Sequence, residues 1–328
     1  MQRKRLSWDL PNWIARPAQG KLHAQRNKHN KMTTDDIFKA IAQQIREATG
    51  KAFALHKGVS VGGGCINSAY RLEGDTGAYF IKINLKDQLP MFEAEAIGLH
   101  ELAATGTVRV PLPICHGICG DKSYLALEYL ELRPSEGTCD RLLGQKLATM
   151  HKITQAYFGW HQDNTIGSTR QPNTRLSDWI EFFTRHRLGF QLKLAETHGF
   201  GGKLQREGEK LMDCLPAFFA TYTPKPSLLH GDLWGGNYAA DNTGQPVIFD
   251  PACYYGDREA DIAMTELFGG FGRDFKLAYS NAYPLDEGYQ TRKPLYNLYH
   301  IINHLNLFGG GYLVQAENMI SRLLAEIT

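Results

Sequence analysis

The sequence predicts an α+β fold with a small β-rich N-terminal lobe and a larger, mainly helical C-terminal lobe. Short strand-like runs separated by turn residues dominate residues 53–129, whereas long helical patterns dominate after residue 130. The length of 328 residues fits two lobes, and 43% hydrophobic with 21% charged residues is typical of a globular protein. This composition excludes a disordered or collagen-like chain. No apolar run approaches the roughly 18 residues that span a bilayer, so we expect no membrane segment.

Residues 1–31 form a basic leader that is expected to be disordered. They hold eight of the 36 Lys and Arg residues but only one of the 34 acidic residues, Asp9. The leader lacks the apolar core of a secretory signal, and we interpret it as a tail or as residues upstream of a start at Met32. A nucleic-acid arm and a transit sequence are the alternatives. The rest of the chain is mildly acidic, so no nucleic-acid partner is expected.

The cysteines favour a cytoplasmic location. Six are scattered along the chain, and no pair has the spacing of zinc ligands. Reduced thiols in the cytoplasm are therefore expected.

The N-terminal lobe is expected to span residues 32–130. Thr33 to Asp36 combine hydroxyl caps with acids that favour a helix start, and Gly50 marks its end. Apolar runs and turn residues then predict strands at 53–61, 68–72, 79–84, 114–117 and 124–129, with a helix at 91–104 before the last two.

The C-terminal lobe is expected to span residues 131–328, with residues 133–137 as the joint. Helical periodicity predicts helices at 138–152, 176–197, 203–222 and 258–268 and in two further C-terminal segments. Residues 228–251 are the main non-helical section. A cleft between two lobes is a common place for a ligand.

The strongest functional signal is the segment from His230 to Asn237, His-Gly-Asp-Leu-Trp-Gly-Gly-Asn, followed by an apolar run that ends at Asp250. His-Gly-Asp alone is more typical of a turn. Phosphoryl transfer from ATP, however, needs a carboxylate to orient the hydroxyl and oxygen ligands for Mg²⁺. The three-part spacing therefore predicts Asp232 as the catalytic base and Asn237 and Asp250 as metal ligands.

A lysine in a predicted strand supports this interpretation. Lys82 lies within Tyr-Phe-Ile-Lys-Ile, where an unpaired buried charge would be costly. Kinases pair such a lysine with a helix glutamate and with phosphate. Glu95 shares a helix face with Phe92 and Leu99, so it is preferred over Glu93 as the partner. A surface lysine and a solvated glutamate are the alternative.

Two weaker signals concern the nucleotide. Gly62, Gly63 and Gly64 would let backbone N–H groups approach phosphates, although three glycines are usually only a loop. The strand that ends with Glu128, Tyr129 and Leu130 would place backbone groups beside adenine at the joint between the lobes. An edge strand without a ligand is the alternative.

Taken together, these motifs and several others resemble those of the fructosamine kinase, or ketosamine 3-kinase, family. The resemblance rests on HGDLWGGN, on FDPACYYGDRE and LFGGF after it, and on VGGGCINSAYRL, FIKIN, MFEAEAIGLHEL, VRVP, WIEFFTRHRL and INHLNLFGGGY. It covers roughly residues 33–328 and leaves out the leader. Aminoglycoside phosphotransferases and choline kinases share the general scheme but do not typically share the Trp and Asp-Pro-Ala combination.

The resemblance implies a protein-kinase-like fold and ATP- and Mg²⁺-dependent phosphorylation of the sugar 3-hydroxyl of ketosamines, either free or on protein lysines. The 3-phosphate makes the adduct break down, so the role would be deglycation. The alternatives are an aminoglycoside or other amino-sugar kinase of the same fold and a nucleotide-binding pseudokinase. Asp-Pro-Ala replaces the Asp-Phe-Gly of larger kinases, so their activation-loop switching is not carried over.

Three further residues are candidates for contacts at the cleft. Trp234 beside Asp232 would either stack on the substrate or pack the loop, and His230 is a second substrate candidate. Cys65 follows the glycine run and is a redox candidate if nearby N–H groups and Lys82 lower its pKa. A small buried filler is the alternative for this thiol. The preferred sugar, the amine carrier and the oligomeric state stay open. Asp257 and Asp261 are expected to cap and brace the helix that follows Asp250.

Overall fold

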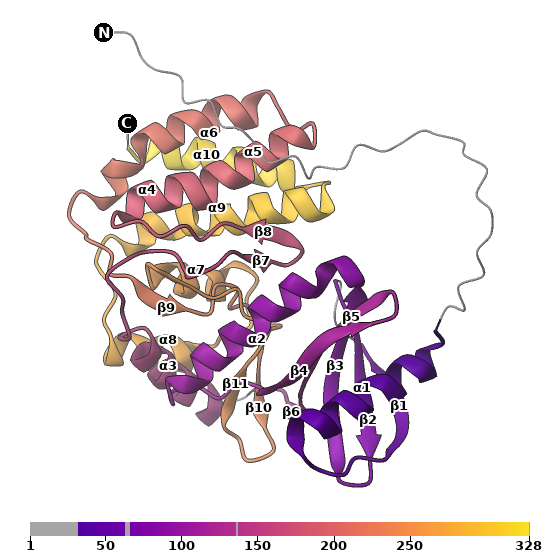
Figure 1. Ribbon diagram of the computed structural model, residues 1–328. Coiled ribbons are helices and arrows are strands. Elements are labelled where there is room, and N and C mark those ends of the chain that lie inside the picture. Colours follow the sequence, from indigo (N-terminus) through magenta and orange to yellow (C-terminus); the bar gives the residue numbers. More distant parts are fainter. Residues whose placement is uncertain (1–31, 63–65, 136, 328) are drawn as a thin grey trace, which may run out of the picture. The chain divides into compact units, whose positions relative to one another are not determined.

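The computed structural model describes residues 32–62, 66–135 and 137–327. All helices and strands of the described residues belong to residues 33–328, which form one compact unit (Figure 1).

The first helix, α1 (Thr34–Thr49), begins and ends where the sequence predicts. The Thr33 hydroxyl accepts the Asp36 N–H at 3.2 Å, and the Asp36 carboxylate accepts the Thr33 N–H at 3.1 Å, which forms a reciprocal capping box. The helix ends at Gly50, whose φ of 66° is the left-handed conformation that glycine adopts without strain.

A five-stranded antiparallel sheet follows, in the order β1-β2-β3-β5-β4. Its strands are β1 (Leu55–Val61), β2 (Ser68–Gly74), β3 (Gly77–Leu85), β4 (Pro113–Cys119) and β5 (Lys122–Glu128), and α2 (Leu89–Ala104) connects β3 to β4. These elements confirm the predicted α+β N-terminal lobe. The register places Lys82 in the central strand, opposite Ala69 and Leu125.

The sheet separates two hydrophobic cores. One core joins α1 to the sheet through residues such as Ile41, Leu72 and Ile81. The other includes Phe92 and Leu99 of α2 and continues into the helical lobe. Because α2 belongs to this larger core, it ties the N-terminal sheet to the helices that follow.

The C-terminal lobe is mainly helical, as predicted, and short strand pairs interrupt the helices (Figure 1). Its elements are β6 (Leu132–Arg133), α3 (Thr138–Met150), β7 (Asn164–Ile166), β8 (Thr169–Gln171), α4 (Trp179–Phe183), α5 (Gly189–Thr197), α6 (Lys203–Cys214), β9 (Ser227–Leu229), β10 (Tyr238–Asp241), β11 (Pro246–Ile248), β12 (Tyr254–Gly256), α7 (Glu259–Leu267), α8 (Arg273–Ala282), α9 (Tyr289–Phe308) and α10 (Tyr312–Ala325).

Several element predictions are corrected by the structure. The helix predicted from 176 begins at Trp179, because the Asp178 side chain caps it, and a π-helical turn over Thr184–Leu188 separates α4 from α5. The helix predicted to reach 222 ends at Cys214, where Leu215–Phe219 continues as a 3₁₀ turn containing Pro216. Three helices, not two, complete the chain.

Among the residues that the structure describes, no helix combines the length and the apolar character needed to cross a bilayer.

Candidate active site

The segment from His230 to Asn237 forms a loop between β9 and β10, and a buried carboxylate from α7 holds its start. Asp261 accepts the backbone N–H of His230 at 2.7 Å and of Gly231 at 2.8 Å. The Asp261 carboxylate also lies 3.2 Å from Nε2 of the buried His151 ring. Burial opposes ionisation, but these partners outweigh it and lower the pKa of Asp261. Asp261 therefore fixes the loop as an ionised clamp.

Gly231 is required by this geometry. Its φ is +83°, and a Cβ there would lie 2.1 Å from the backbone oxygen of Ala252. No side chain fits at that distance, so the loop passes directly against the segment that follows Asp250.

His230 lies beneath the loop, which corrects its assignment as a substrate contact. Its side chain is completely buried. Nδ1 accepts the Asp232 N–H at 3.2 Å, and Nε2 donates to the Phe249 carbonyl at 3.0 Å. Burial lowers the pKa of the ring, which suits this neutral arrangement. With both nitrogens engaged and no exposed surface, His230 positions Asp232 instead of contacting a ligand.

Asp232, Asn237 and Asp250 face one another across the loop. The Asn237 side-chain amide donates to the Asp232 carbonyl at 2.8 Å and to its carboxylate at 3.2 Å. This orientation directs the amide N–H groups to Asp232 and leaves Oδ1 as the outward acceptor. Burial, together with the negative charge of Asp250, raises the pKa of Asp232 to about 7.

These oxygens suit a divalent cation. Carboxylate and amide oxygens are the ligands that Mg²⁺ prefers, and the mutual repulsion that raises the pKa of Asp232 would be relieved by a cation. Among the described non-glycine residues, Asp250 alone has a positive φ, 58°. Asp and Asn tolerate this conformation better than other residues with a Cβ. The Asp250 carboxylate contacts the Lys82 ammonium and is 48% exposed, so it remains accessible to a cation.

Lys82 forms the predicted ion pair with Glu95. Its ammonium lies 2.5 Å from Glu95 Oε1 and 2.6 Å from Asp250 Oδ1, and its side chain is only 6% exposed. Burial alone would lower the pKa of Lys82, but the two carboxylates outweigh it and raise the pKa. Lys82 is therefore a buried, charged group, and the alternative of a surface lysine is excluded.

The predicted adenine-binding residues are partly exposed at the end of β5. The Glu128 N–H donates to the Leu112 carbonyl at 2.9 Å, and its carboxylate accepts the Leu112 N–H at 3.1 Å. The Tyr129 ring lies under the Arg71 guanidinium, 4.5 Å from its centroid. Leu130 follows directly. The side chains of Glu128 and Tyr129 thus hold the chain in place, and adenine binding by their backbone stays a prediction.

The predicted phosphate loop is only partly described. Gly62 is exposed directly after β1, with open space where a Cβ would stand. Gly63, Gly64 and Cys65 lie outside the described residues, so their predicted roles in phosphate binding and redox chemistry stay predictions.

Trp234 both packs the loop and remains accessible. Its ring covers Gly236, where a Cβ would lie 2.3 Å from it, and 39% of the residue is exposed. Packing on the loop therefore describes part of its surface, and stacking on a substrate stays a prediction.

A second loop, residues 268–271, supports the catalytic loop from outside. Tyr238, next to Asn237, donates its hydroxyl to the Gly270 carbonyl at 2.8 Å and stacks on Phe271 at 4.4 Å. Gly235 and Gly270 touch through their backbones. The sequence motif Leu-Phe-Gly-Gly-Phe thus forms a wall beside the predicted catalytic residues.

Sequence reasoning missed two residues that join the parts of the site. Arg109 donates to the buried Asp241 carboxylate at 3.1 Å and lies 3.8 Å from Glu128, while its carbonyl accepts the Ile248 N–H. It thereby links the end of β5 to the strand that leads to Asp250. Glu101 of α2 accepts the Trp160 indole N–H at 2.6 Å and a tyrosine hydroxyl at 2.7 Å. Isolated charges in VRVP and in α2 gave no signal, because their partners are distant in sequence.

Comparison with known proteins identifies relatives over most of the chain. The family model for fructosamine kinase matches residues 37–326. A probable ketoamine kinase from Synechocystis sp. is 49% identical over 88% of this chain and 97% of its own length. The chloroplastic protein-ribulosamine 3-kinase of Arabidopsis thaliana is 46% identical over 84% of this chain and 85% of its own length.

Solved structures agree in fold. A candidate fructosamine-3-kinase from Haemophilus somnus superposes with a TM-score of 0.81 at 31% identity, over 88% of this chain and 97% of that one. The aminoglycoside phosphotransferase APH(2'')-Ib, solved with ADP, has a TM-score of 0.60 at 13% identity, over 90% of this chain and 99% of that one. The second likeness shows the kinase-like fold alone.

Proposed function

Because the chain belongs to the fructosamine kinase family, we propose that it transfers the γ-phosphoryl group of ATP to the 3-hydroxyl of ketosamines. The observation that carries the proposal is the arrangement of Asp232 beside Asn237, near Asp250, which contacts the buried, charged Lys82. A carboxylate beside oxygen ligands for Mg²⁺ and a lysine for the phosphates is the arrangement that phosphoryl transfer to a hydroxyl requires.

Each polar group has a defined task in this reaction. Asp232 orients the sugar hydroxyl and accepts its proton as the oxygen attacks phosphorus. Lys82, oriented by Glu95, contacts the phosphates. Asn237 and Asp250 would hold Mg²⁺, which supplies positive charge to the phosphates when bound. Adenine would lie against the backbone of residues 128–130, and the glycines at 62–64 would approach the phosphates.

The expected substrates are ribulosamines, erythrulosamines and fructosamines, either free or attached to protein lysines. Two relatives support this range through their names, ketoamine kinase and protein-ribulosamine 3-kinase. The 3-phosphate makes the adduct break down and releases the amine, so the biological role is deglycation.

The test is ATP consumption measured against a panel of these ketosamines, with kanamycin as the aminoglycoside alternative. Turnover on at least one ketosamine and none on kanamycin is expected. The reverse selectivity would contradict the proposal. A pseudokinase is disfavoured because Lys82, Asp232, Asn237 and Asp250 are all present.

Two further aspects stay predictions. A cytoplasmic location is predicted, and the plant relatives are named as chloroplastic. No nucleic-acid partner is predicted, and salt-dependent binding assays with and without residues 1–31 test this.

A further inference from the structure

Exposed aromatic rings extend from the catalytic loop to the end of α9. Trp234 meets Phe268 edge-on at 6.3 Å, Phe268 lies 4.9 Å from His304, and His304 lies 5.6 Å from Phe308. We call these four residues the aromatic strip. Trp234, Phe268 and Phe308 are 39%, 41% and 55% exposed. The four rings form a chain of ring contacts between three segments that are distant in sequence, and three of the rings belong to exposed residues.

The strip begins at the reacting centre. The Trp234 backbone N–H donates to the Asp232 backbone carbonyl at 3.2 Å, so the loop holds the Trp234 backbone beside Asp232, and its ring covers Gly236 in the same loop.

The far end of the strip lies close to the N-terminal lobe. A Cβ on Gly167, at the tip of the β7–β8 hairpin, would lie 3.0 Å from Ile66, which follows the glycine-rich segment, and 3.1 Å from Leu307. Leu307 precedes Phe308 in α9. The end of α9 and Ile66 of the N-terminal lobe therefore both lie beside the tip of this hairpin.

The strip carries no positive charge of its own. The His304 Nδ1–H donates to the His300 carbonyl at 2.8 Å, and burial lowers the pKa of its ring, so His304 is neutral near pH 7. Neutral aromatic faces attract cations through their π electrons.

We propose that the aromatic strip binds the amine side of the ketosamine, a protonated secondary amine that carries an aliphatic chain, as on a glycated lysine. This inference rests on the proposed function. In a ketosamine the amine nitrogen is three bonds from C3, so it lies within about 4 Å of that carbon. With the 3-hydroxyl at Asp232, the amine lies near Trp234, and its chain extends over Phe268 toward Phe308.

The two ends of the strip have different tasks. Trp234 is close enough to contact the ammonium group of any ketosamine. Phe308, at the far end, meets only carriers with a chain long enough to reach it, and methylene groups gain by covering its exposed ring. The strip therefore selects for lysine-like carriers over small amines.

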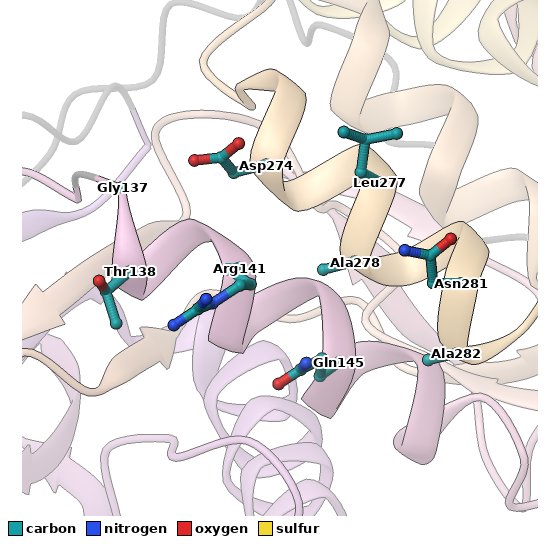
Figure 2. A pocket seen from close by; sticks show the side chains of 9 residues that line it. All are labelled: Gly137, Thr138, Arg141, Gln145, Asp274, Leu277, Ala278, Asn281 and Ala282. Atoms are coloured by element: carbon teal, nitrogen blue, oxygen red, sulfur yellow. The ribbon is translucent and has the colours of Figure 1, made fainter.

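A larger groove elsewhere serves as a comparison. It has a volume of about 610 Å³ between α3 and α8, and its lining includes Arg141, Asp274 and Leu277 (Figure 2). It shares no lining residue with the strip, and nothing in the described structure indicates what would cover it. Leu277 is 48% exposed, which makes it a matched apolar control.

The experiment compares Phe308→Ser, Phe268→Ser and the control Leu277→Ser on two substrates, the ribulosyl adducts of Nα-acetyl-lysine (on its ε-amine) and of methylamine. In the two strip variants, kcat/KM for the lysine adduct should fall relative to that for the methylamine adduct by about fivefold, the scale of one methylene group that loses its apolar contact. Most of the change should be in KM. Leu277→Ser should leave the ratio unchanged.

The possible outcomes distinguish failure of the strip inference from failure of the proposed function. A ratio within twofold of wild type in both strip variants would overturn the inference and leave the proposed function standing. An equal fall in kcat on both adducts would show that the rings only support the loop, which also overturns it. If the wild-type chain phosphorylates neither adduct, the inference fails; if it also phosphorylates no other ketosamine of the panel, the proposed function fails with it.

Discussion

The backbone contact between Gly270 and Gly235 gives a sharp test of how the wall at residues 268–271 positions the catalytic loop. Gly269 and Gly270 both have left-handed φ angles, +76° and +99°. A Cβ on Gly269 would meet no heavy atom within 4 Å. A Cβ on Gly270 would lie 2.7 Å from the Gly235 Cα, although carbon atoms in contact prefer about 3.5–4.0 Å. The two alanine variants therefore differ mainly in this clash.

The magnitudes follow from these geometries. The left-handed backbone lowers the stability of each alanine variant by roughly 1–2 kcal/mol. In Gly270→Ala, overpacking lowers stability by about 1–3 kcal/mol more. This strain is released by moving Gly235, which lies between Asp232 and Asn237. A displacement of about 1 Å near reacting groups costs on the order of 10²-fold in rate. We therefore expect turnover to fall about tenfold or more in Gly270→Ala relative to Gly269→Ala.

The assay combines urea unfolding with steady-state turnover on a ribulosamine. The unfolding free energies of the two variants should differ by about 1–3 kcal/mol. If Gly270→Ala retained the turnover and stability of Gly269→Ala, the wall would have no role in positioning the loop, and this reasoning would be refuted.

Four further predictions test other parts of the account. Asp250→Ala should abolish Mg²⁺-dependent ATP binding, measured by calorimetry. Asp250→Asn should also abolish this binding, but with less loss of stability, because Asn tolerates a φ of 58°. Unchanged Mg-ATP affinity in both variants would contradict the metal assignment. Asp261→Asn should lower the unfolding free energy by about 3 kcal/mol or more, measured in urea, because two buried N–H donors lose a charged acceptor. Burial lowers the pKa of His300 to about 3, below its unfolded value of about 6.5. The free energy of unfolding should therefore fall as pH drops below 6.5, by up to about 1.4 kcal/mol per pH unit. His300→Gln should remove this contribution to the slope, which corresponds to one bound proton. A chain starting at Met32 should keep the rate and melting temperature of the full chain, and a loss of several degrees would show that the leader docks.

The parts of the site that sequence predicted are those whose signal is local. The pairing of a strand lysine with a helix glutamate in kinases predicts a partner for Lys82, helix periodicity favours Glu95 over Glu93, and the ion pair confirms it. The five-residue spacing of Asp232 and Asn237 can be recognised within one loop. The apolar run before Asp250 predicts a strand, and β11 ends two residues before Asp250.

The parts that sequence missed depend on contacts between distant residues. Asp261 clamps the backbone of His230 from 31 residues away, so it was expected only to brace its own helix. The sequence predicts His230 as a substrate candidate because a polar loop gives no sign that one of its rings is buried. The aromatic strip joins positions 234, 268, 304 and 308, which no local pattern connects. The β7–β8 hairpin has three-residue strands, too short for an alternating pattern.

The most direct test of the central claim is the position of the transferred phosphate. The chain is incubated with ATP, Mg²⁺ and the ribulosyl adduct of Nα-acetyl-lysine, and the product is followed by ³¹P and ¹³C NMR, with Asp232→Asn as the comparison. The account predicts phosphate on C3, followed by release of the lysine amine. In Asp232→Asn, turnover should be about 10² or more lower, with ATP affinity retained. Phosphate on another hydroxyl, or near-normal turnover without the Asp232 carboxylate, would contradict it.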